Sequence, residues 1–181
     1  GERLNPQEIR NVAFRGKLNS LLLTLSANQF FRQQFKIADD QSSAMYRKMQ
    51  DVELVLRFFT LKEKWRSFAG DFSKAMDNFM LTHQNPNSEK LKAFEKAFCD
   101  VIGEVERLFG SHAFHRPEGD GWREQALTPL YDAEMVAVAE VGVEKLRVLP
   151  NLAGLQIIRE LFEDESFASS VRTGTNTTSK V

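Results

Sequence analysis

Apolar residues recur every three or four positions over long stretches of this chain, which is the spacing of an amphipathic helix. The clearest stretch covers residues 91–108, and shorter ones cover 18–25, 45–59 and 72–80. Only five Pro and ten Gly among 181 residues leave few breaks for strands and turns. The pattern predicts an all-α fold, an irregular bundle of about seven to nine helices. They would form a single compact subdomain over residues 1–172, followed by a polar tail at 173–181.

Helix ends are also marked in the sequence. Asn5 is a good N-cap, Pro6 follows at the first helical position, and Glu8 stands where a capping-box carboxylate binds the cap N–H. Asn87 or Ser88 would start the helix over the 91–108 stretch, and Gly110 would end it. We expect one long helix from about residue 44, a central core helix over 130–149, and irregular structure over 110–124.

Charge is divided unevenly between the two parts of the chain. Residues 1–66 carry 12 Lys and Arg against 7 Asp and Glu, an excess of five cations, whereas the remainder carries an excess of six anions. An anionic partner should therefore meet the first third. An ordinary solvated helix face is the simpler interpretation, because this excess is modest for a nucleic-acid binder. If DNA is a partner, the candidate contacts are Lys62, Lys64 and Arg66.

Composition excludes several classes of protein. The mean hydropathy is −0.37, and no apolar run approaches the 18 or so residues of a membrane span. The first ten residues lack the layout of a signal peptide. A single cysteine, Cys99, rules out an internal disulfide framework and a multi-cysteine zinc site. We therefore expect a cytoplasmic protein with no membrane partner.

Few side chains suggest chemistry of their own. His112 and His115, with Glu118 and Asp120 nearby, could hold zinc or iron, but a surface loop is the favoured interpretation. Cys99 is expected to be a small buried hydrophobe. Arg57, which lies in an apolar stretch, is expected to pair with Glu53 one turn earlier and to remain on the surface. Three carboxylate pairs are interpreted as solvated faces rather than acid–base sites: Asp39/Asp40, Asp51/Glu53 and Asp132/Glu134. The sequence thus offers no catalytic residue and no metal site.

The run NPQEIRN, residues 5–11, is the strongest local signal. On a helix Glu8 and Asn11 share a face and Arg10 is turned away. Capping explains Asn5 and Glu8 but neither Arg10 nor Asn11. A capped helix with ordinary surface charges is one interpretation. The other assigns Glu8, Arg10 and Asn11 to a contact surface or a ligand pocket.

The run GERLNPQEIRN resembles the segment that joins the two halves of the GmrSD-type restriction-endonuclease domain, in the ParB/sulfiredoxin-like family of phage-defence proteins. Scattered patterns similar to this family cover nearly the whole chain. They comprise Gly1, Leu4 and Glu8 to Asn11; Asp51, Glu53 and Leu56 to Phe58; Phe109-Gly110 with Ala113-Phe114; and Phe167 to Thr175. The Asp-Gly-Gln-Gln-Arg run that family members carry upstream, and that is associated with nucleotide hydrolysis, is absent. The chain therefore resembles the helical second half of such a domain.

This resemblance implies a supporting subdomain of an NTP-dependent, DNA-targeting nuclease in phage restriction. The subdomain would pack on a missing N-terminal catalytic half, with Glu8, Arg10 and Asn11 at their interface or at a nucleotide pocket. NTP and a divalent metal would belong to the parent, and no cofactor is expected in this chain, which alone would not be an enzyme. Two alternatives stay open: a stand-alone α-helical protein-interaction module, and an all-α metallohydrolase built on His112 and His115.

Overall fold

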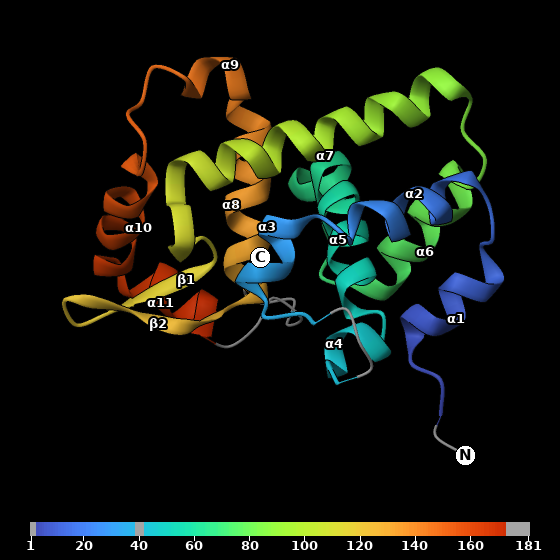
Figure 1. Ribbon diagram of the computed structural model, residues 1–181, viewed down its shortest axis with the longest axis horizontal. Coiled ribbons are helices and arrows are strands. Elements are labelled where there is room, and N and C mark those ends of the chain that lie inside the picture. The colour runs from blue at the N-terminus through green and yellow to red at the C-terminus, as the bar shows by residue number, and fades with distance from the viewer. Residues whose placement is uncertain (1–2, 39–41, 173–181) are drawn as a thin grey trace.

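The computed structural model describes residues 3–38 and 42–172 (Figure 1). Within these ranges the fold is predominantly helical, as predicted, with eleven α-helices, two 3-10 turns and one β-hairpin. The proposed tail at 173–181 lies outside the described residues. The elements are α1 Pro6–Ala13, α2 Lys17–Leu25, α3 Gln29–Gln34, α4 Ala44–Arg47, α5 Gln50–Lys64, η1 Trp65–Ser67, α6 Phe72–His83, α7 Ser88–Phe109, η2 Gly110–His112, β1 His115–Glu118, β2 Gly121–Ala126, α8 Thr128–Val141, α9 Val143–Leu146, α10 Ala153–Glu163 and α11 Glu165–Arg172.

Polar caps start several helices where the sequence places them. The Asn5 side chain accepts hydrogen bonds from the first turn of α1, and Glu8 completes the capping box. Asn28, Asp71 and Asn87 cap α3, α6 and α7 in the same way. Helix α8 begins two residues before the expected start at residue 130, because Leu127 occupies the cap position and Thr128 is already helical.

The 22-residue helix α7 spans the molecule and organises its packing. It lies across α2, α8 and α10, while α5 packs against α8, α2 and α6 beneath it (Figure 1). One aromatic cluster forms where α5, α6 and α7 meet, with the Phe59 ring 5.2 Å from that of Phe94. A second joins α3 to α8, with the Phe31 ring 5.9 Å from that of Tyr131. Phenylalanine is thus used mainly as core material, in agreement with its lack of a polar group.

Two expected long helices are each divided, which is why the structure has more helices than predicted. Met49 adopts a left-handed conformation with φ of 53° and separates α4 from α5. Gly142, with φ of 91°, separates α8 from α9. Left-handed backbone is natural for glycine but uncommon for methionine, so only the second break is signalled by its residue type.

The stretch expected to be irregular forms an antiparallel hairpin instead. Strands β1 and β2 pair with His115 opposite Ala126 and Glu118 opposite Gly121, with an irregular register between His115 and Pro117. The hairpin projects beside α10 and α11 at one end of the molecule (Figure 1). Gly119 occupies the turn with a positive φ of 58°. No helix among the described residues is both long and apolar enough to cross a membrane.

Candidate functional site

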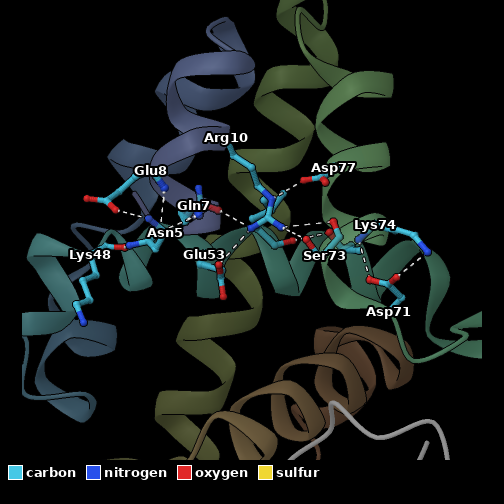
Figure 2. A network of polar contacts seen from close by, with 12 residues as sticks. Asn5, Gln7, Glu8, Arg10, Lys48, Glu53, Asp71, Ser73, Lys74 and Asp77 are labelled. Atoms are coloured by element: carbon cyan, nitrogen blue, oxygen red, sulfur yellow. Dashed lines mark hydrogen bonds and ion pairs between the residues drawn. The ribbon is translucent and has the colours of Figure 1, made fainter. Parts of the chain in front are cut away.

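Arg10 lies in the interior of the chain rather than on its surface. It leaves α1 toward α5 and α6, where its Nε donates to Asp77 at 2.6 Å and its Nη1 to Glu53 at 3.2 Å (Figure 2). Its Nη2 donates to the hydroxyl of Ser73 at 2.9 Å. The side chain is 3% exposed. Arg10 is therefore not an ordinary surface charge, because its guanidinium ties three helices of this chain together. Its assignment to an interface or a nucleotide pocket stays a prediction.

Glu8 and Asn11 also have partners within the chain. Glu8 accepts the backbone N–H of Asn5 at 2.7 Å, and the Asn5 amide donates to the carbonyl of Lys48 in the segment after α4 (Figure 2). Asn11 accepts a 2.8 Å hydrogen bond from the buried Asn19 of α2. Both side chains remain half-buried. Their assignment to an interface or a nucleotide pocket stays a prediction.

Helix α1 is turned with its polar side inward. Its buried residues are Gln7 and Arg10, whereas Leu4, Ile9 and Val12 are 62%, 52% and 58% exposed. A surface helix usually does the opposite and packs its apolar stripe on the core. We call Leu4, Ile9 and Val12 the α1 outer face. Leu4 and Ile9 occupy the N′ and N4 positions of a hydrophobic staple, which fixes how the chain enters the helix.

Arg57 does not pair with Glu53 on the surface, as expected, but with Asp132 inside the protein. Its Nε lies 3.2 Å from one Asp132 oxygen, and its Nη2 contacts the other. The guanidinium also stacks over Phe72, 3.5 Å from the ring centroid. Both partners are nearly inaccessible. The expected i−4 pair with Glu53 does not form because α8 places the Asp132 carboxylate directly against the face of α5 that carries Arg57.

Three carboxylates expected on solvated faces are buried. Asp51, Asp132 and Glu134 are 2%, 5% and 3% exposed. Burial raises the pKa of all three, because a charged carboxylate loses its hydration, and that of Glu134 is raised well above its usual value. Arg57 partly offsets the effect at Asp132. Both oxygens of Glu134 accept the backbone N–H of Phe114, at 3.2 and 3.0 Å. The pair Asp39/Asp40 lies outside the described residues.

The candidate DNA contacts lie at the exposed end of α5 and in η1. Lys62, Lys64 and Arg66 are all exposed, but Arg66 pairs with Glu140 of α8, which also accepts the indole N–H of Trp65. These two donors lower the pKa of Glu140 and keep it charged. The positive charge at this end is therefore partly neutralised within the chain.

The remaining candidates occupy ordinary structural positions. The His112 ring stacks on Trp122 at 5.3 Å, and the His115 ring lies 6.2 Å from that of His112. Across residues 3–38 and 42–172 no three or more His, Cys, Asp or Glu gather in a group that could hold a metal ion. Cys99 is exposed and not buried, because Phe98 and Val101 occupy the inner side of α7.

The comparisons with known proteins do not assign this chain to a family. No protein-family model, no curated protein and no solved structure matches it. Its function must therefore be argued from its own geometry.

Proposed function

We propose that this chain is the helical subdomain of an NTP-dependent, DNA-targeting restriction protein of the phage-defence type. It packs through α1 on a separate catalytic half, which would hold the NTP and the divalent metal of the reaction. The subdomain itself supports the catalytic half and does not perform the chemistry. The resemblance of residues 1–11 to the junction of such proteins supports this proposal, and so does the orientation of α1.

The α1 outer face is the observation that carries the proposal. Leu4, Ile9 and Val12 keep more than half of their surface in solvent, although Arg10 and Gln7 on the same element are almost fully buried. Apolar residues gathered on one exposed face are typical of a surface that meets another polypeptide. The half-buried Glu8 and Asn11 flank this face and would supply polar contacts at its rim.

The test uses this chain and the upstream half of its parent, expressed as two polypeptides. We expect co-elution of the two on size exclusion, and loss of the complex in Ile9→Arg and Val12→Arg. Leu81→Arg on α6 is the matched control, because Leu81 is an exposed apolar residue, 67% accessible, outside the α1 outer face. An upstream reading frame that lacks the Asp-Gly-Gln-Gln-Arg run, or a complex unaffected by both α1 variants, would overturn the proposal.

DNA contact belongs to the same proposal. Lys62 and Lys64 extend from the exposed end of α5, away from the Arg10 network. Contacts between these lysines and DNA phosphates would add a salt-sensitive affinity for DNA to the parent protein. Such contacts do not depend on the base sequence of the DNA.

A stand-alone protein-interaction module is the second candidate, and one apolar groove favours it. A cavity of about 500 Å³ lies between the end of α5, α8 and α11, and is lined by Leu61, Trp65, Phe68, Val136, Phe167 and Val171. It shares no residue with the α1 outer face. A reading frame that begins near Gly1, with binding lost on Trp65→Ala but kept in Ile9→Arg, would favour this alternative.

A further inference from the structure

Three ionisable side chains from three helices meet where α6 ends and α7 begins. His83 is the last residue of α6, and its Nε2 lies 2.9 Å from Oε2 of Glu63, near the end of α5. Its Nδ1 lies 3.0 Å from Nζ of Lys90, in the first turn of α7. We call these residues the Glu63–His83–Lys90 relay. They are separate from the α1 outer face and from the partners of Arg10.

The two partners of His83 determine where its ring proton lies. A lysine ammonium offers three donors and no acceptor, so Nδ1 of the ring must accept from Lys90. The neutral imidazole then carries its proton on Nε2, and this N–H donates to the Glu63 carboxylate. The ring is thus held as a base toward Lys90. A carboxylate behind the ring also stabilises the imidazolium that forms when the base takes a proton.

The surroundings hold the ring in this orientation. His83 is 9% exposed, and the Phe79 and Phe94 rings lie in edge-to-face contact with it, with centroids 4.5 and 5.6 Å away. The backbone N–H of Lys90 donates to the Asn87 cap at 2.8 Å, which fixes the backbone that carries the amine. Lys90 itself is exposed. The amine is therefore open to a reactant, whereas its base is shielded.

This arrangement matches the one that activates a nucleophile in covalent catalysis. There a nucleophile lies within hydrogen-bond reach of a base, and a third group orients that base. An ordinary lysine amine reacts slowly at neutral pH because it is almost wholly protonated. A base at 3.0 Å can take this proton as the amine attacks. The Phe94 ring, 5.7 Å from Nζ, favours the ammonium but lies near the limit of a cation–π contact.

We propose that Lys90 is a site of acylation by activated acyl donors of the thioester class, with His83 as its base and Glu63 as the group that orients this base. His83 takes one proton from the Lys90 ammonium, and the free amine attacks the carbonyl carbon of the thioester. The C–N bond forms, the C–S bond breaks, and the departing thiolate takes the second proton and leaves as a thiol. His83 then releases its proton to solvent. The product is an amide at Lys90, which no longer carries a positive charge.

The test measures the acylation rate of each lysine in the purified chain by mass spectrometry of its peptides, with the acetyl thioester of N-acetylcysteamine as the probe. At neutral pH we expect Lys90 to react at least about tenfold faster than Lys92, which is exposed on the same helix. His83→Gln keeps a donor and an acceptor but cannot take a proton, so the rate at Lys90 should fall to that at Lys92. Glu63→Gln should slow Lys90 as well, whereas Glu95→Gln, also on the exposed side of α7, should not.

The pH profile distinguishes a base from simple accessibility. The advantage of Lys90 over Lys92 should be largest near neutral pH. It should shrink at about pH 9, where ordinary amines begin to lose their protons unaided. It should also shrink at about pH 5, where imidazoles are protonated and no longer accept. An advantage that is the same at all three pH values would overturn the inference, because accessibility alone does not depend on pH.

Equal rates at Lys90 and Lys92 would also overturn the inference, as would a folded His83→Gln chain that keeps the fast rate at Lys90. If His83→Gln fails to fold, Glu63→Gln decides the question, because Glu63 is 44% exposed. A slower rate at Lys90 alone would support the inference, and an unchanged rate would overturn it. Ile9→Arg should leave the rate at Lys90 unchanged, so failure of the docking proposal and failure of this one can be told apart.

Discussion

Arg57 of α5 and Asp132 of α8 form a two-point ion pair in the interior, although they are 75 positions apart in the chain. The pair joins two helices that also lie against each other. Removing one member of such a pair leaves the other charged and buried.

We expect Asp132→Ala to lower the free energy of unfolding by about 3–5 kcal/mol, because Arg57 would remain buried without its carboxylate. The double variant Arg57→Met/Asp132→Leu should recover most of that loss. Urea denaturation measures both. A double variant as unstable as Asp132→Ala would show that the pair acts through more than its charges.

Arg10→Ala should destabilise the isolated chain by about 2–3 kcal/mol, because its hydrogen bonds to Gln7, Glu53, Ser73 and Asp77 are lost. The sequence alone suggests no more than about 0.5 kcal/mol, the usual range for a surface position. Asn5→Ala is the comparison and should cost about 1 kcal/mol through the lost cap. Thermal or urea unfolding of both variants distinguishes the two views, and a loss at Arg10 smaller than at Asn5 would contradict the network.

Glu134 makes stability depend on pH in a direction opposite to that of a paired carboxylate. Its folded-state pKa is raised well above the ordinary value of 4.5, so the folded chain holds a proton that the unfolded chain releases. Stability associated with this group is therefore fully present below pH 4.5 and is lost as pH rises toward the folded-state pKa. Glu134→Gln copies the protonated form and should be more stable than wild type at neutral pH. The gain should disappear at low pH in parallel urea titrations.

Two helix glycines should respond oppositely to alanine. A Cβ on Gly154 of α10 would meet the Phe109 ring at 2.5 Å, so Gly154→Ala should destabilise by about 1–3 kcal/mol. A Cβ on Gly103 of α7 would meet nothing within 4 Å. Gly103→Ala should therefore stabilise by about 0.5–1 kcal/mol through helix propensity. Melting temperatures of the two variants provide the check, and the same sign for both would refute the packing argument.

Affinity for duplex DNA, if the chain has any, should depend on the end of α5. Lys62→Glu with Lys64→Glu should weaken binding more than Lys90→Glu with Lys92→Glu on α7. The double change at α5 should also reduce the slope of log affinity against log salt by about one for each lost phosphate contact. Equal effects of the two pairs in fluorescence anisotropy would remove the case for a localised cationic face.

Local rules explain most of what the sequence predicts correctly. Asn5 and Asn87 cap helices as predicted, because capping involves only neighbours three positions away. The left-handed Met49 has no such signal, since its residue type does not favour that conformation. The hairpin has a weak signal in the glycines at 119 and 121, but its strands lack the alternating apolar pattern that marks a half-buried strand.

The candidate sites were predictable only where they depend on neighbours in sequence. Capping identifies Glu8, whereas no neighbour in sequence indicates that Arg10 is buried, because its partners, Glu53 and Asp77, are 43 and 67 positions away. The burial of Asp51 is not signalled by its neighbours in sequence either, and its carboxylate lies 3.8 Å from Arg32 of α3. A lone charge within an apolar run, as at Arg57, was the one available signal for a buried pair.

Helix α1 is attached to the body by polar groups while its apolar side is already in solvent, so its detachment exposes little new apolar surface. The urea dependence of an opening reaction scales with the surface that it exposes. Backbone amides of α1 should therefore exchange with deuterium through an opening that urea barely promotes, unlike those of α5 and α7. A partner seated on Leu4, Ile9 and Val12 would change this, because detachment would then uncover an apolar interface and its urea dependence would become steep.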